Sequence, residues 1–114
     1  MKVKGLYSIE SELMHNGTIV AWAFFRADDF SSNILWFNDN LIQPGVAIEP
    51  HKHKDVEEVY YVQQGQGEMR IGEEERSVSE GDAIYLPPQK THTLRKSRTH
   101  PLRFVCIGAK IRDD

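Results

Sequence analysis

Cysteine is almost absent from this chain of 114 residues, in which Cys106 is the only one. A single cysteine cannot form an intrachain disulfide, and this removes the main argument for a secreted, disulfide-stabilised scaffold. Cys106 lies in the apolar run Phe104–Ile107, where a free cysteine is typically a small buried hydrophobe. We therefore interpret Cys106 as a core residue rather than a nucleophile, and we expect a cytoplasmic protein.

Long apolar runs are missing as well. The longest is Ile19–Phe25, which is far shorter than the roughly 20 residues that a membrane-spanning helix needs. The segment Met1–Gly5 is not followed by the apolar stretch of a signal peptide. We expect neither secretion nor a membrane partner.

The chain also lacks a basic excess, because its net charge is −3. Proteins that bind nucleic acids need lysine and arginine to displace counterions from phosphates, so no nucleic-acid partner is expected. We interpret the short basic cluster Arg95–Arg98 as a solvated loop. With 39% hydrophobic and 27% charged residues, the composition is that of a globular protein, and the length suits a single domain spanning residues 1–114.

Helical periodicity is absent after residue 15, and short strands alternate with turn signals instead. Glycine, proline and asparagine favour turns, which predicts turns at Asn38–Asn40, Gly65–Gly67 and Glu80–Asp82. Many short strands at this spacing indicate an all-β sandwich or barrel. The expected strands are Thr18–Phe25, Asn33–Trp36, Leu41–Gln43, Glu58–Gln63, Glu68–Ile71, Arg76–Val78, Ala83–Leu86, Thr91–Leu94 and Leu102–Ile107.

The strand Thr18–Phe25 is apolar on both faces. A strand with one face in water should alternate with polar residues. By alternation, Val20, Trp22 and Phe24 would face one layer, and Ile19, Ala21, Ala23 and Phe25 the other. The second layer belongs either to the other subunit of a homodimer or to the protein's own N-terminal segment.

Two histidines and a glutamate form the most informative pattern. Residues two apart in a strand point to the same face, so His51 and His53 would project into one space, as two imidazoles must to share an ion. Glu58 and Val62 share a face of the next expected strand, so if Val62 is interior, Glu58 points toward these histidines. His92 follows on a later strand.

This spacing resembles that of the cupin superfamily, in particular its small single-domain members. The first motif of that family, Gly-x5-His-x-His-x(3,4)-Glu-x6-Gly, is matched by Gly45, His51, His53, Glu58 and Gly65. In its second motif, Gly-x5-Pro-x-Gly-x2-His-x3-Asn, the matching residues are Gly81, Pro87 and His92. Gln89 and Lys96 stand where a glycine and an asparagine are usual.

The resemblance covers about residues 40–107 and implies a double-stranded β-helix, the cupin jelly-roll barrel. Residues 1–39 would then form N-terminal strands that cover the barrel or a dimer interface. The resemblance also implies that His51, His53, Glu58 and His92 bind one divalent metal ion, although some cupins keep the fold without a metal. Three imidazoles and a carboxylate suit Fe, Mn, Zn, Ni, Co or Cu better than calcium or magnesium. A closed structural zinc site is the alternative, and the lack of cysteine ligands argues against it.

Three functions are compatible with such a site. The first is a metal-dependent enzyme of dioxygenase, isomerase, epimerase or lyase type that acts on a small oxygen-rich molecule. The second is a non-catalytic module that binds or senses a small molecule through the metal, and the third, a storage protein, is disfavoured because storage cupins usually carry two barrels. Tyr60 shares a face with Glu58 and is the candidate catalytic residue, either as a proton donor or by orienting the substrate, although it could simply fill space. His15 and His100 are interpreted as solvent-exposed.

Overall fold

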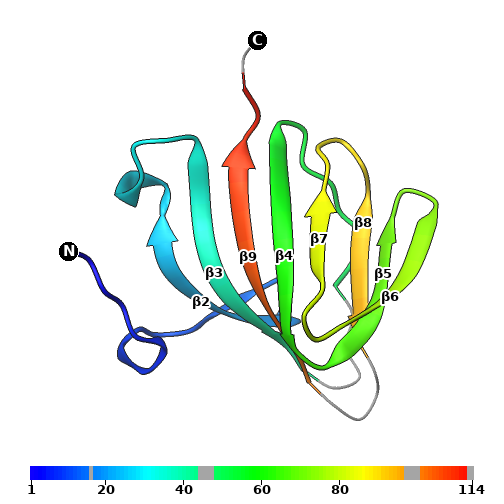
Figure 1. Cartoon of the computed structure of the whole chain (residues 1–114), viewed down its shortest axis with the longest axis horizontal. Helices are drawn as coiled ribbons and strands as arrows, with labels where there is room; N and C mark the ends of the chain where they lie inside the picture. The colour runs from blue at the N-terminus through cyan, green and yellow to red at the C-terminus, as the bar shows by residue number, and fades with distance from the viewer. Residues whose placement is uncertain (16, 44–47, 97–100, 113–114) are drawn as a thin grey trace.

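Antiparallel β-strands form most of the structure, a computed structural model that describes residues 1–15, 17–43, 48–96 and 101–112 (Figure 1). One six-stranded sheet has the order β1-β2-β3-β9-β4-β7, and a three-stranded sheet has the order β6-β5-β8. No helix among the described residues is long and apolar enough to cross a membrane. The strands are β1 (Glu12–Met14), β2 (Ile19–Arg26), β3 (Ile34–Ile42), β4 (Val56–Gln64), β5 (Gln66–Ile71), β6 (Glu74–Ser79), β7 (Ala83–Leu86), β8 (His92–Lys96) and β9 (Leu102–Lys110), and two short 3-10 turns are η1 (Leu6–Ser8) and η2 (Ala27–Asp29).

Strand β4 shows the inside–outside alternation most clearly. Glu58, Tyr60 and Val62 are buried, whereas Val59 and Tyr61 are exposed. This confirms the alternation expected for the strand and places Glu58 on the inner face. The interior is a single apolar cluster to which both sheets contribute, with Phe104, Ile42, Ile48, Leu86, Leu94, Leu102 and Val62 as its largest fully buried side chains.

The turn predicted at Asn38–Asn40 is wrong, because these residues lie in the middle of β3. The two strands expected on either side of it are one continuous strand, which pairs with β2 on one edge and with β9 on the other. Pairing on both edges gives hydrogen-bond partners to the backbone of these asparagine and aspartate residues, which otherwise favour turns. Asp39 points away from Asn38 and Asn40, and it accepts a 2.7 Å hydrogen bond from Arg103 Nη2.

Strand β2 alternates as expected up to Ala23 and then changes register. A β-bulge between Ala23 and Phe25 pairs Phe25 with Phe37. Directly paired residues share a face of the sheet, so Phe25 lies on the outer face with Trp22, contrary to the expected alternation. The bulge has the further effect of turning Arg26 toward the inner face, opposite Trp36. A strict two-residue period cannot anticipate an inserted residue.

The loop after β7 contains the position where the family pattern has a glycine. Gln89 occupies it with φ = 65°, in the left-handed region that glycine adopts at little cost. Its backbone N–H donates a 2.7 Å hydrogen bond to the carbonyl oxygen of His53. Gln89 thus adopts a backbone conformation that is strained for a residue other than glycine. Its hydrogen bond joins this loop to the segment that carries the histidines.

We predict that Gln89→Gly raises the free energy of unfolding by about 0.5–1 kcal/mol. Glycine removes the steric strain of the left-handed conformation, and the greater backbone freedom of glycine in the unfolded chain offsets part of this gain. Urea denaturation of the metal-free protein measures this. Gln63→Gly is the control, since Gln63 lies exposed in β4 and a glycine in a strand should destabilise it. A Gln89→Gly variant less stable than the starting protein would contradict the assignment of strain.

Candidate metal centre

The segment that carries His51 and His53 runs beside β8. Ile48 N–H donates to the Leu94 carbonyl oxygen at 3.2 Å, and His51 and His92 exchange two backbone hydrogen bonds of 3.1 and 2.8 Å. The segment thus extends the smaller sheet past β8, although of its described residues only His51 forms a β-bridge. This pairing places the histidines of the first motif directly beside the histidine of the second.

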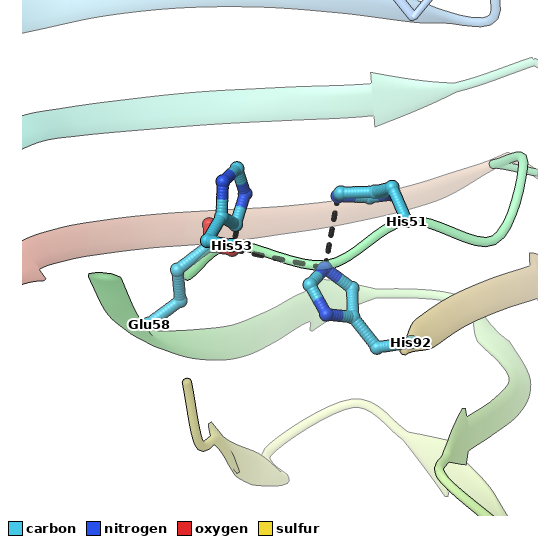
Figure 2. A group of neighbouring side chains, drawn as sticks. All are labelled: His51, His53, Glu58 and His92. Atoms are coloured by element: carbon cyan, nitrogen blue, oxygen red, sulfur yellow. Dashed lines mark hydrogen bonds and ion pairs between the residues drawn. The ribbon is translucent and has the colours of Figure 1, made fainter. Parts of the chain in front are cut away.

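The four predicted metal ligands converge on one point, as Figure 2 shows. Their donor atoms all lie within 4.8 Å of one another. His51 Nε2 is 2.9 Å from His92 Nε2, and Glu58 Oε1 is 3.3 Å from His53 Nε2 and 3.7 Å from His92 Nε2. Glu58 comes from β4 in the larger sheet and His92 from β8 in the smaller one, so the cluster bridges the two sheets.

The donor set fits a divalent metal ion. Four ligands at roughly 2 Å from one ion would have their donor atoms at most about 4 Å apart, close to the spacing observed. Glu58 Oε1 is fully buried, and within the described residues it accepts no hydrogen bond. A buried carboxylate oxygen without a hydrogen-bond donor is costly unless a cation neutralises it.

The protonation of the histidines also suits metal binding. Burial, and then the nearby His51 and His53, lower the pKa of His92 to about 4, so its imidazole is neutral near pH 7. His51 Nδ1 lies 3.0 Å from the carbonyl oxygen of Glu49. A carbonyl can only accept, so in the neutral imidazole of His51 the proton is on Nδ1, and the lone pair of Nε2 faces the cluster.

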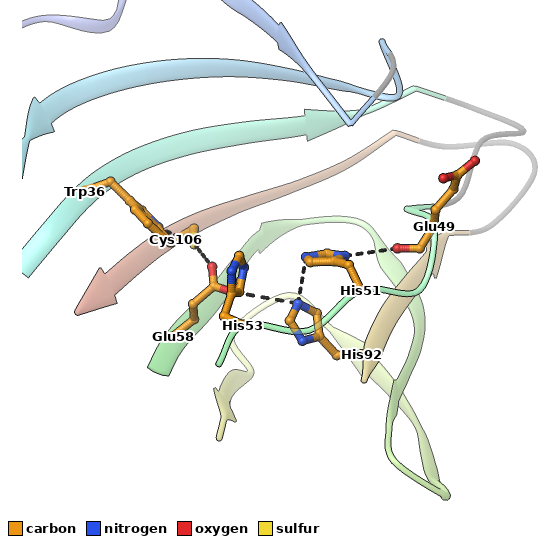
Figure 3. Close-up of polar contacts among 7 residues, drawn as sticks. All are labelled: Trp36, Glu49, His51, His53, Glu58, His92 and Cys106. Carbon is orange, nitrogen blue, oxygen red and sulfur yellow. Dashed lines mark hydrogen bonds and ion pairs between the residues drawn. The ribbon is translucent and has the colours of Figure 1, made fainter. Parts of the chain in front are cut away.

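Sequence reasoning missed the polar role of Cys106, although its burial confirms the interpretation as a core residue. The Cys106 thiol donates a 3.0 Å hydrogen bond to Glu58 Oε2. Trp36 Nε1–H in turn donates to Cys106 Sγ at 3.3 Å (Figure 3). Burial, and then the charge of Glu58, raise the pKa of Cys106, so the sulfur keeps its proton. The chain of contacts fixes the orientation of the carboxylate.

Gly108 makes room for this arrangement. A Cβ atom at Gly108 would lie 2.2 Å from Cε2 of Trp36, so the indole can pack against β9 only because the residue is glycine. The alternation of β9 could have signalled that Cys106 points inward. No sequence pattern signals its contact with the indole.

His15 was expected to be solvent-exposed, and this is wrong. Its ring is half-buried, with its centroid 4.6 Å from that of His51. It lies at the turn between β1 and β2 with φ = 53°, and that turn was not recognised as the rim of the site. His100 and Gly45 lie outside the described residues.

Tyr60 is buried on the same inner face as Glu58. Its ring centroid lies 4.5 Å from that of Phe104 and 6.5 Å from that of His92. Burial raises the pKa of Tyr60 well above its usual value, and the charge of Glu58 raises it further. The phenol therefore stays protonated and is available as a hydrogen-bond donor.

A cavity of about 530 Å³ opens in front of the cluster. His51, His53, Glu58 and Tyr60 line one side of it. Side chains of β2 and β3, mostly apolar, line the other. This volume lies in the range of small-molecule binding sites. A second cavity of about 250 Å³ lies among β5, β6 and β7 and contains none of the four ligands.

Comparisons with known proteins agree with this geometry. A cupin-domain family matches residues 41–108. An uncharacterized protein of Methanocaldococcus jannaschii is 39% identical over 58 residues, which are 51% of this chain and 46% of that protein. The match therefore spans about half the length of this relative.

Solved structures show the same fold at low sequence identity. A predicted oxalate decarboxylase from Thermotoga maritima has a TM-score of 0.89 at 18% identity, over 96% of this chain and 100% of that one. The polyketide cyclase RemF from Streptomyces resistomycificus has a TM-score of 0.81 at 18% identity, over 100% of this chain and 82% of that one. With a family match over more than half of its residues, the chain belongs to the cupin family.

Proposed function

We propose that His51, His53, Glu58 and His92 hold one divalent transition-metal ion and that the protein is a metal-dependent enzyme acting on a small oxygen-rich molecule. The observation that carries the proposal is the convergence of four donor atoms within 4.8 Å beside a cavity of about 530 Å³ whose wall includes His51, His53 and Glu58. The ion would be Fe, Mn, Zn, Ni, Co or Cu, which accept mixed nitrogen and oxygen ligands.

The residues around the cluster have separable roles in this proposal. A bound ion would act as a Lewis acid toward substrate oxygens. The Cys106 thiol holds Glu58 in place, and the Glu49 carbonyl sets the tautomer of His51. Tyr60 would donate a hydrogen bond or a proton to the substrate. The reaction remains of dioxygenase, isomerase, epimerase or lyase type, because a shared fold does not select a chemistry.

A non-catalytic binding or sensor module is the second candidate. One observation favours it: among the described residues that line the cavity, the only carboxylate besides Glu58 is Glu12, which is ion-paired with Arg26. A second free carboxylate beside the cluster is therefore missing from the described part of the wall, although the His15 imidazole lies on it. A cytoplasmic location stays a prediction from the sequence.

We predict that the protein binds about one divalent transition ion per chain and that His51→Ala/His53→Ala abolishes this binding. Two of the four ligands would be lost, while the apolar core stays unchanged. Elemental analysis after dialysis against the metal measures occupancy, and circular dichroism checks that the variant is still β-rich. Lys52→Ala is the control, since this exposed side chain lies between the two histidines. Full occupancy in the double variant would refute the site.

Tyr60→Phe separates the enzyme from the binding module once a substrate or ligand is known. In an enzyme that uses the hydroxyl, turnover should fall by roughly 10²–10⁴-fold. In a binding module, ligand affinity should fall by about 0.5–1.5 kcal/mol. Metal affinity should not change in either case, because Tyr60 is not one of the four ligands. Tyr61→Phe is the control, since Tyr61 is 48% exposed on the outer face. If neither quantity changes, Tyr60 only fills space.

We also propose that two copies of the chain associate through the outer face of the larger sheet. Val59, Tyr61, Tyr85 and Ile107 remain exposed there, and the strand register makes Val59 a neighbour of both Tyr85 and Ile107. The N-terminal segment reaches Phe25, where the Lys4 ammonium lies 5.4 Å from the ring centroid. It therefore covers part of the apolar strand β2, and a second subunit would cover the exposed apolar patch on β4, β7 and β9.

Light scattering should accordingly show a dimer at micromolar concentration. Val59→Lys/Tyr61→Lys should convert it to a monomer, because like charges would meet across the dimer interface. Leu13→Lys, a change at an exposed residue of β1, should leave the dimer intact. A wild-type protein that is monomeric at this concentration would refute the proposed association.

A further inference from the structure

The two oxygens of the Glu58 carboxylate lie in different surroundings, although the residue as a whole is only 6% exposed. Oε1 lies 3.3 Å from His53 Nε2 and 3.7 Å from His92 Nε2, and within the described residues it accepts no hydrogen bond. Oε2 accepts the 3.0 Å hydrogen bond from the Cys106 thiol (Figure 3). One oxygen therefore faces the histidines, and the other is already engaged by a residue of β9.

The contacts of Cys106 direct its single proton to Glu58. Trp36 Nε1 lies 3.3 Å from Cys106 Sγ, and an indole N–H can only donate, so the sulfur accepts from Trp36. An ionised carboxylate can only accept, so the thiol donates to Glu58. Cys106 is only 4% exposed, and water therefore does not compete for this hydrogen bond.

The register of three strands holds the thiol in place. Trp36 on β3 and Glu58 on β4 are both paired with Gly108 on β9, so the three residues form one row across the sheet. Cys106 lies two positions before Gly108 and on the same face of β9. Because glycine has no side chain, the indole can reach the thiol over this position, where a Cβ would lie 2.2 Å from Cε2 of Trp36. The orientation of the donor is thus set by the sheet.

This hydrogen bond limits how Glu58 can bind a metal. A carboxylate binds an ion through one oxygen or through both. Binding through both would require Oε2 to turn toward the histidines and away from the thiol. The hydrogen bond would then be lost in a buried place, and losing a hydrogen bond to a charged group is costly there. The arrangement therefore favours a carboxylate that binds through Oε1 alone.

We propose that Cys106 is a positioning residue that keeps Glu58 Oε2 off the metal, so that a ligand can bind the metal through two of its own oxygens. The three histidines and Oε1 would supply four donors, which leaves two positions on an ion of octahedral geometry. Coordination through both oxygens of Glu58 would leave only one. This inference rests on the proposed metal site, and it assigns to Cys106 the ability of that site to accept chelating ligands.

Two monoanionic probes test the role of the thiol. Acetohydroxamate binds a metal through two oxygens, whereas azide occupies a single position. Each is titrated into the cobalt-loaded protein, and the visible absorption of cobalt reports binding. In Cys106→Ala the released Oε2 would also bind the metal, so the affinity for acetohydroxamate should fall by roughly 10-fold, the effect of one hydrogen bond. The affinity for azide should not change, because azide needs only one position.

Two further variants separate the hydrogen bond from core packing. Cys106→Ser keeps a donor at the same place and should retain the affinity of the wild type for both probes. Val78→Ala is the control for loosened packing, since Val78 is buried on β6 and lines the second cavity, which contains none of the four ligands. It should also leave both affinities unchanged. An unchanged acetohydroxamate affinity in Cys106→Ala, equal losses for both probes, or a loss in Cys106→Ser as large as in Cys106→Ala would overturn the proposal.

Infrared difference spectra between the cobalt-loaded and metal-free wild type provide a readout that needs no variant. Among the described residues of the cluster, Glu58 is the only carboxylate, so the metal-dependent carboxylate bands belong to it. The antisymmetric and symmetric stretches lie farther apart when a carboxylate binds through one oxygen than when it binds through both. We expect the wide separation in the wild type and a narrower one in Cys106→Ala.

A narrow separation in the wild type would overturn the inference. So would a sulfur-to-cobalt charge-transfer band that is lost in Cys106→Ala, because the thiol would then be a ligand itself. Absence of cobalt binding by the wild type would refute the proposed metal site, whereas cobalt binding with both oxygens of Glu58 refutes only the role of Cys106.

Discussion

The candidate site depends on the backbone pairing of His51 with His92. Two hydrogen bonds join these residues, which lie 41 positions apart in the sequence. They position the segment that carries His51 and His53 along the edge of β8, and the imidazoles of His51 and His92 meet as a result. Without this pairing, the histidines of the two motifs would have no fixed relation to each other or to Glu58 on β4.

The interior of the protein combines an apolar core with a few buried polar groups, which would destabilise the fold if they had no partners. Glu58 is the most demanding of them, because its carboxylate is almost completely buried. The Cys106 thiol satisfies one of its oxygens, and the other faces the histidines. Gly108 and Trp36 then hold the thiol in place. The stability of this part of the fold therefore depends on a buried carboxylate that favours a bound cation. This dependence links the fold to the proposed function.

Much of this arrangement follows from local patterns in the sequence. The two-residue period of β4 predicts that Glu58, Tyr60 and Val62 face inward, and burial confirms it. The motif spacing predicts that His51, His53, Glu58 and His92 converge, and their donor atoms do so. These predictions succeed because strand alternation is a local property, and because each motif places its residues relative to a strand.

Other features depend on contacts that no local pattern contains. Asn38 and Asn40 are of a residue type that favours turns, yet pairing on both edges of β3 keeps them in a buried strand. The bulge in β2 inserts one residue and moves Phe25 to the outer face. His15 resembles an ordinary turn residue until the fold brings it against His51. In each case the outcome is decided by a strand or side chain distant in the sequence.

The central claim is that these three histidines and one glutamate share a single ion. X-ray absorption spectroscopy of the cobalt-loaded protein tests it most directly, because scattering from imidazole rings identifies histidine ligands. The account predicts three imidazole nitrogens and at least one oxygen at about 2.0–2.2 Å from the metal, with one imidazole lost in His92→Ala. A spectrum without imidazole scattering, or one that His92→Ala leaves unchanged, would contradict it.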